Sequence, residues 1–122
     1  ENHHLLNAVA FNKMKHGVII LNTARGRLID TDALIDAIES RKVQGAALDV
    51  LEHEDGLYYA NRMGDPIVTR RMAVLRSFPN VILTPHTAFY SRIVVSNMAE
   101  KTIKCVLDME KGIENKNIIV YR

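Results

Sequence analysis

Short apolar runs alternate with stretches of helical periodicity through most of the chain. Val18–Leu21 consists of four consecutive apolar residues, mostly β-branched. Such a run is typical of a strand that is covered on both faces, as in parallel sheets. Val43–Leu48 is a second short run, rich in small residues, and Asn80–Thr84 is a third. The pattern predicts strands at these three positions.

Two helices are predicted in the first forty residues. Ala8–Lys15 carries apolar residues three or four positions apart, and Asn7 stands in the N-cap position. A second helix begins at Asp30 or Thr31, either of which can cap it, and continues to about Arg41. Each helix therefore alternates with a strand along the chain.

The second half of the chain is less regular until its last helix. Periodicity fails from His53 to Asp65, which predicts a long loop of the kind that often carries function. Thr69–Arg76 is a mixed segment without a clear period. The longest predicted helix is Arg92–Glu110, which ends before Gly112, and its apolar side is expected to belong to the core.

Strands alternating with helices predict an α/β fold, with a parallel sheet of about three strands, flanking helices and a long C-terminal helix. The 122 residues are 48% apolar and 25% charged, which fits one packed domain or part of one. The first residues, Glu1–His4, form neither a signal peptide nor a start at methionine. The chain is therefore expected to be a piece of a longer protein.

Charge, hydropathy and cysteine content indicate which partners and which cellular compartment to expect. Sixteen basic and fourteen acidic residues leave a net charge of +2, and they are interspersed, so no nucleic-acid partner is expected. No apolar run approaches the roughly 18 residues of a membrane span, so no membrane partner is expected either. The single cysteine, Cys105, excludes an internal disulfide and predicts a cytoplasmic protein.

Three reactive side chains each follow one of the predicted strands. Arg25, Glu52 and His86 lie just past the carboxyl ends of these strands, at the edge where open α/β sheets bind ligands. A guanidinium matches a carboxylate with two parallel hydrogen bonds, and an imidazole can give or take a proton near neutral pH. A neighbouring Glu52 would favour the charged imidazole. The three residues predict acid–base chemistry on a carboxylated substrate.

A structural reading of the same residues stays open, because loop Arg and Glu residues often make only surface ion pairs and a His after Pro is often a turn residue. His3, His4, His16 and His53 have no spacing that closes a metal site, so no metal is expected. No serine lies in a Gly-x-Ser-x-Gly turn, which argues against a serine hydrolase.

Three ordered blocks resemble the signatures of the D-isomer-specific 2-hydroxyacid dehydrogenases: Asn22–Gly26, Gly45–Glu52 and Asn80–Ala88. The resemblance covers nearly the whole chain. Ala88-Phe89-Tyr90 and the loop Glu52–Pro66 look similar to the D-lactate dehydrogenase branch, including its relatives from vancomycin resistance. The resemblance implies a Rossmann-type sheet, NAD as cofactor and a short 2-keto acid as substrate.

The resemblance also implies roles for single residues. Arg25 would bind the substrate carboxylate, His86 would protonate the carbonyl oxygen as hydride arrives from the nicotinamide, and Glu52 would pair with His86. Further residues would contact the ligands: Thr23 and Ala24 along the nicotinamide ring, Asp49 beside its carboxamide, Tyr90 on the substrate side, and His4 near the cofactor phosphates or ribose.

The sequence departs from the family in one large respect, because it contains no Gly-x-Gly-x-x-Gly motif. Residues 1–112 are therefore expected to form the C-terminal half of an NAD-binding domain, and residues 113–122 a tail that would return to a substrate domain. Little or no activity is expected of the chain alone, and the alternative is a catalytically inert folded fragment or interaction module. An exposed edge at Val18–Leu21, or exchange of the last helix, predicts a homodimer.

Overall fold

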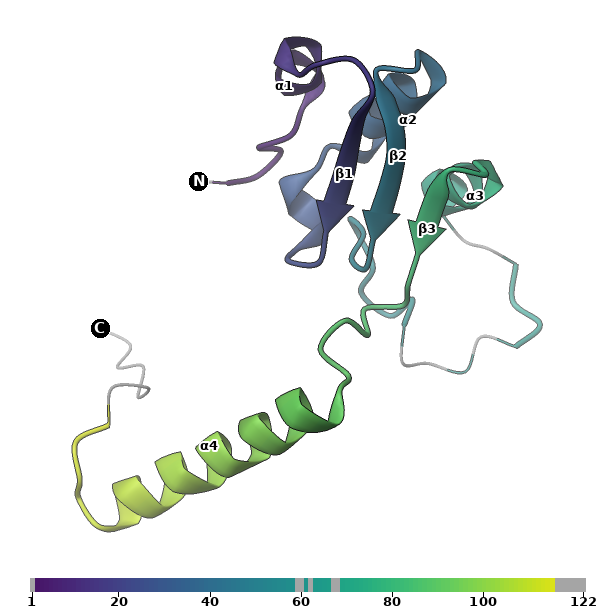
Figure 1. Cartoon of the computed structure of the whole chain (residues 1–122). Helices are drawn as coiled ribbons and strands as arrows, with labels where there is room; N and C mark the ends of the chain where they lie inside the picture. Colours follow the sequence, from purple (N-terminus) through teal and green to yellow (C-terminus); the bar gives the residue numbers. More distant parts are fainter. Residues whose placement is uncertain (1, 59–60, 62, 67–68, 116–122) are drawn as a thin grey trace. The chain divides into compact units, whose positions relative to one another are not determined.

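The computed structural model describes residues 2–58, 61, 63–66 and 69–115 (Figure 1). The chain divides into two units, Glu1–Ala88 and Phe89–Arg122. Among the described residues, three strands lie in the first unit and one long helix lies in the second. The predicted α/β class is confirmed by this arrangement.

The first unit is built on a parallel sheet with the strand order β1-β2-β3. The strands are β1 (Val18–Asn22), β2 (Val43–Leu48) and β3 (Val81–Leu83), close to the three predicted runs. Ala46 of the central strand is aligned with Ile20 on one side and with Val81 on the other. Because all three strands run in the same direction, their carboxyl ends meet at one edge of the sheet.

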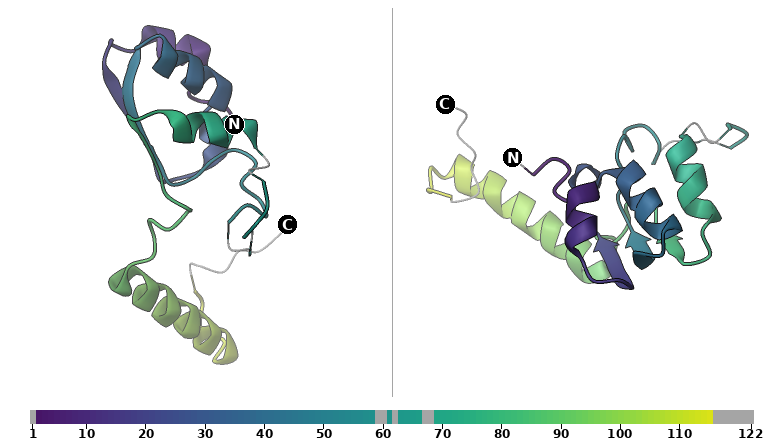
Figure 2. Two further views of the ribbon diagram at one scale, coloured as in Figure 1. Left: turned by 90° about the vertical axis from the view of Figure 1, so that its right-hand side faces the viewer. Right: turned by 90° about the horizontal axis from the view of Figure 1, so that it is seen from above.

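The helices of the first unit all cover one face of the sheet, as the left-hand view of Figure 2 shows. They are α1 (Ala8–Lys13), α2 (Thr31–Glu39) and α3 (Arg70–Ser77), with the short 3-10 turn η1 (Gly26–Leu28) between β1 and α2. Sequence reasoning left α3 as a mixed segment.

Side-chain caps begin the first two helices where the sequence predicts them. The Asn7 carboxamide oxygen accepts a hydrogen bond from the Ala10 N–H at 3.1 Å. The Asp30 carboxylate accepts from the N–H groups of Asp32 and Ala33 at 3.1 and 3.2 Å. These contacts satisfy backbone donors that the first turn of a helix leaves without partners.

The core lies between this helical layer and the sheet. Its most deeply buried side chains come from α1, α2, β2, the start of the following loop and α3: Phe11, Leu34, Val43, Val50 and Leu75. The opposite face of the sheet is uncovered in the described residues. Ile19 and Leu21 of β1 are 62% and 72% exposed, so the prediction that this strand is covered on both faces is wrong for this chain.

The second unit consists mainly of α4 (Arg92–Glu110), at the predicted position. Ser91 caps it by accepting a hydrogen bond from the Val94 N–H at 3.3 Å, and Gly112 follows with a φ of +65°. No residue of α4 is buried, so the expectation that its apolar side belongs to a core is wrong. The described part of this unit has no second layer for the helix to pack against.

Most of the predicted tail, residues 116–122, lies outside the described residues. Within the part of the chain that the structure describes, no helix is both long and apolar enough to cross a lipid bilayer.

Candidate functional site

The loops that follow the three parallel strands carry the candidate residues. Arg25 follows β1, the segment Asp49–Glu54 follows β2, and His86 follows β3. Since the strands are parallel, these loops leave the sheet at one edge, as the sequence predicts.

The turn after β1 is organised by Asn22, a buried residue that sequence reasoning did not single out. Its carboxamide oxygen accepts a hydrogen bond from the Ala24 N–H at 3.1 Å, and its Nδ2 donates to the Arg25 carbonyl at 2.9 Å. Thr23, Ala24 and Arg25 are exposed on this turn. The Arg25 guanidinium donates to the Ala24 carbonyl at 2.7 Å and keeps its charge at the surface.

Gly26 brings the turn after β1 against the loop after β2. A Cβ atom at this position would lie 2.0 Å from the Leu51 carbonyl oxygen and 2.6 Å from the Glu52 nitrogen. Those distances are far inside van der Waals contact, so only glycine fits. The close approach fixes the segment that carries Arg25 next to the segment that carries the glutamates.

Asp49 fixes the turn after β3. Its buried carboxylate accepts hydrogen bonds from the Thr84 hydroxyl at 2.5 Å and from the N–H groups of Thr87 and Ala88 at 2.9 Å each. Burial by itself raises the pKa of Asp49, but these hydrogen bonds outweigh it and hold the pKa below its ordinary value. Asp49 therefore remains ionised and positions the segment that includes His86.

His86 lies in a strained backbone conformation beside a carboxylate. Its φ is +53°, in the left-handed region, and its N–H donates to the Asp49 carbonyl at 2.8 Å. Its Nδ1 lies 2.7 Å from Oε1 of Glu54. A left-handed conformation at a residue other than glycine costs about 1–3 kcal/mol and persists where surrounding contacts enforce it, frequently at functional sites.

The predicted pairing of Glu52 with His86 is wrong. Glu52 Oε1 instead lies 2.6 Å from Nε2 of His4, and its Oε2 accepts from the Thr31 N–H at 3.0 Å and from the Thr31 hydroxyl at 2.8 Å. The physical reason is the first turn of α2, whose backbone N–H groups have no partners within the helix and attract a carboxylate. The carboxylate beside His86 is that of Glu54, two residues further along the loop.

The pKa of Glu52 is affected by the same contacts. Burial raises it, but the hydrogen bonds from His4 and Thr31 prevail, so that the pKa lies below its ordinary value. Glu52 is therefore an anion that joins the N-terminal segment to the start of α2.

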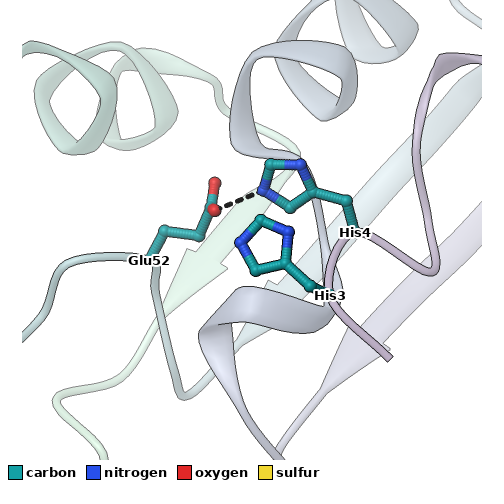
Figure 3. Close-up of side chains that lie close together, drawn as sticks. All are labelled: His3, His4 and Glu52. Carbon is teal, nitrogen blue, oxygen red and sulfur yellow. Dashed lines mark hydrogen bonds and ion pairs between the residues drawn. The ribbon is translucent and has the colours of Figure 1, made fainter. Parts of the chain in front are cut away.

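The side chains of His3, His4 and Glu52 lie close together, as Figure 3 shows. The N-terminal segment reaches this place by running parallel to residues 27–30. The His4 N–H donates to the Arg27 carbonyl at 2.9 Å, and Leu6 forms a parallel bridge with Ile29. The ring centroids of His3 and His4 are 3.9 Å apart. Sequence spacing gave no sign of this cluster, because Glu52 is 48 residues from His4.

Tyr90, predicted on the substrate side, belongs to the second unit. Its ring makes an edge-on contact with Phe89, with centroids 6.1 Å apart. Its role toward a substrate stays a prediction.

The residues predicted to contact the nicotinamide end of a dinucleotide lie at the carboxyl edge of the sheet. Thr23 and Ala24 lie on an exposed turn beside Arg25, and their place along the nicotinamide ring stays a prediction, as does the binding of a carboxylate by Arg25. The Asp49 carboxylate, by contrast, is occupied by Thr84, Thr87 and Ala88, and its place beside a carboxamide stays a prediction. The glycine-rich loop that cradles a pyrophosphate is absent from these 122 residues.

Comparison with known proteins identifies the family of the chain. The model of the family "D-isomer specific 2-hydroxyacid dehydrogenase, NAD binding domain" matches residues 1–88. An aromatic 2-oxoacid reductase from Clostridium sporogenes is 44% identical over 110 residues, covering 90% of this chain and 33% of the relative. A D-lactate dehydrogenase from Lactiplantibacillus plantarum is 49% identical over 98 residues, covering 80% of this chain and 30% of the relative.

Solved structures give the same result. A D-lactate dehydrogenase from Treponema pallidum has a TM-score of 0.90 at 35% identity, over 98% of this chain and 36% of that one. The NAD-complexed D-isomer specific 2-hydroxyacid dehydrogenase from Lactobacillus delbrueckii ssp. bulgaricus also has a TM-score of 0.90, at 30% identity and the same coverage. The chain thus spans about a third of the length of these relatives, and it belongs to the NAD-binding domain family of the D-isomer specific 2-hydroxyacid dehydrogenases.

Proposed function

We propose that the chain supplies the proton donor and the carboxylate anchor of a D-2-hydroxyacid dehydrogenase of the D-lactate type, which reduces a short 2-keto acid such as pyruvate. The observation that carries the proposal is the contact between His86 Nδ1 and Glu54 Oε1 at 2.7 Å, on the sheet edge that also bears Arg25. An imidazole held by a carboxylate on one nitrogen is oriented to transfer a proton through the other.

Each residue has one task in this proposal. Arg25 binds the carboxylate of the keto acid and fixes its orientation. His86 gives a proton from Nε2 to the carbonyl oxygen while the carbonyl carbon is reduced, and Glu54 stabilises the imidazolium and holds its tautomer. NADH, when bound, supplies the hydride, so the products are a 2-hydroxy acid and NAD⁺.

Thr23 and Ala24 would line the nicotinamide ring, because their turn is exposed and held by Asn22 next to Arg25. Asp49 would act mainly by positioning the backbone around His86. His4 and Tyr90 would contact the cofactor and the substrate, respectively, as the resemblance to the family implies.

A chimeric dehydrogenase provides the test. In it, these residues replace the matching segment of the Lactiplantibacillus plantarum D-lactate dehydrogenase, to which the chain is 49% identical. Pyruvate reduction is followed through the loss of NADH absorbance. We expect turnover by the chimera and none detectable from the 122-residue chain alone.

The two arms of the assay separate the possible outcomes. A well-folded chimera without turnover would favour the alternative of an inert fragment or interaction module. Comparable rates from the chain alone would refute the claim that it lacks part of its cofactor site.

A further inference from the structure

We propose that His3, His4 and Glu52 form a binding site for a divalent transition-metal ion such as Zn²⁺, separate from the His86–Glu54 pair. The possible ligand atoms of these three residues all lie within 4.8 Å of one another. Figure 3 shows both imidazoles projecting from the N-terminal segment toward the glutamate. Imidazole nitrogen together with carboxylate oxygen is a donor set that zinc prefers.

The distances require only small side-chain movements. Tetrahedral zinc with bonds of about 2.0–2.1 Å places its ligand atoms about 3.4 Å apart. His4 Nε2 and Glu52 Oε1, now 2.6 Å apart, would move apart to admit the ion. The His3 side chain is exposed, so rotation of its ring can bring a nitrogen to the ion. A water molecule would complete the fourth position.

Neighbouring contacts already hold the carboxylate in place. Oε2 of Glu52 is engaged by the backbone N–H and the hydroxyl of Thr31, at 3.0 and 2.8 Å, while Oε1 faces the imidazoles. Metal-binding carboxylates are normally supported by such outer contacts, which reduce the ordering needed when the ion binds.

His4 is fixed as firmly as the glutamate. Its φ is +50°, its N–H donates to the Arg27 carbonyl at 2.9 Å, and its carbonyl accepts from Asn7 Nδ2 at 3.1 Å. Asp30 Oδ2 lies 3.8 Å from His4 Nδ1, on the side of the ring away from Glu52. If the two atoms approach to hydrogen-bond distance when the ion binds, Asp30 becomes the usual carboxylate partner of a metal-bound histidine, which sets the tautomer and increases the basicity of the ligand nitrogen.

An ion has a route to the site from solvent. The side chain of His4 is 33% exposed, whereas that of Glu52 is 8% exposed, so the imidazoles form the open side and the carboxylate the closed side. The strained backbone at His4 is consistent with a position maintained for binding rather than for local stability.

Isothermal titration calorimetry of the chelator-treated 122-residue chain with ZnCl₂ tests the site directly. We expect one saturable site per chain. His3→Ala should weaken the affinity at least tenfold, because it removes one of the three protein ligands. His3 has no part in the His4–Glu52 hydrogen bond, so this substitution leaves that contact intact. His16→Ala, which removes an exposed histidine elsewhere in the first unit, is the matched control and should leave the affinity unchanged.

A second readout keeps the proposal testable if a variant does not fold. Co²⁺ bound by two imidazoles and a carboxylate in tetrahedral geometry absorbs strongly in the visible region, and Glu52→Gln should abolish that band while circular dichroism reports on folding. If Glu52→Gln unfolds, the His3→Ala result decides alone. Absence of saturable binding, or equal weakening by His3→Ala and His16→Ala, would overturn the proposal. The zinc titration reports on His3, His4 and Glu52, whereas turnover by the chimera depends on His86 and Glu54, so failure of one proposal can be told apart from failure of the other.

Discussion

Glu54 Oε1 lies 2.7 Å from His86 Nδ1, and the two residues come from loops 32 positions apart in the sequence. The pair exists because Asp49, at the end of β2, binds the backbone of the turn after β3 and thereby brings that turn to the loop of Glu54. The parallel sheet places both loops at the same edge, and the buried Asp49 carboxylate aligns the turn after β3 with the loop after β2.

Replacing Arg25 by Lys in the chimeric dehydrogenase should lower kcat/KM for pyruvate by about 10- to 100-fold. Lysine keeps the charge but loses the two-pronged match to a carboxylate, and a charged hydrogen bond contributes about 1.5–3 kcal/mol. Steady-state kinetics should show most of the loss in KM. Arg27→Lys, two residues along, serves as the control, and an equal loss there would remove the special role of Arg25.

Replacing Gly26 by Ala should destabilise the chain by about 3 kcal/mol or more, because the new methyl group would overlap the Leu51 carbonyl. Gly45→Ala is the matched control, since a Cβ there would lie 3.1 Å from the Asn80 carbonyl oxygen and need only a small shift. Urea unfolding followed by circular dichroism measures both. Equal effects at the two positions would show that the close approach at Gly26 is relaxed in solution.

The stability of the chain should fall steeply in acid because of Asp49. Its pKa in the folded chain is lower than the ordinary 3.8, so its contribution is complete well above that value and is lost as the pH falls through the folded pKa. Thermal unfolding measured between pH 6 and about 2 should show this loss. Asp49→Asn should reduce the slope, whereas Asp36→Asn, on the exposed side of α2, should preserve it.

The uncovered face and the edge at β1 should recruit a second copy of the chain. Ile19 and Leu21 are more than half exposed, and β1 lies at one edge of the described sheet. Unpaired apolar strands tend to associate. Light scattering across a wide concentration range should give the mass of a dimer, and Ile19→Lys should shift it toward the monomer. A monomeric mass at every concentration would contradict this expectation.

Elements with a clear period could be predicted from the sequence, and those without one could not. The strand Val43–Leu48 is found at its predicted bounds, and the helix Arg92–Glu110 likewise, because apolar runs and caps are local signals. Arg70–Ser77 was missed as a helix, since its four apolar residues, Met72–Leu75, are consecutive rather than spaced three or four apart, and two arginines open the segment. Burial of Leu75 in the core stabilises this helix, although the local sequence does not predict it.

The candidate site was predicted in its location but not in its detailed contacts. Strand ends correctly placed Arg25 and His86 on one edge, because this follows from parallel topology. The choice between Glu52 and Glu54 depends on how an irregular loop turns, and a loop has no period that fixes which carboxylate faces which element. Glu52 accepts hydrogen bonds from Thr31 at the start of α2, and no rule of sequence spacing predicts this contact.

The most direct test of the account compares Glu54→Gln with Glu52→Gln in the chimeric dehydrogenase, measured as kcat and KM for pyruvate. Because Glu54 supports the proton donor, Glu54→Gln should lower kcat by about 100-fold or more with little change in KM. Glu52→Gln, which affects the contacts of Glu52 with His4 and Thr31, should retain kcat within about tenfold. A large loss of kcat in Glu52→Gln together with a nearly normal Glu54→Gln would contradict the assignment of Glu54 as the partner of His86.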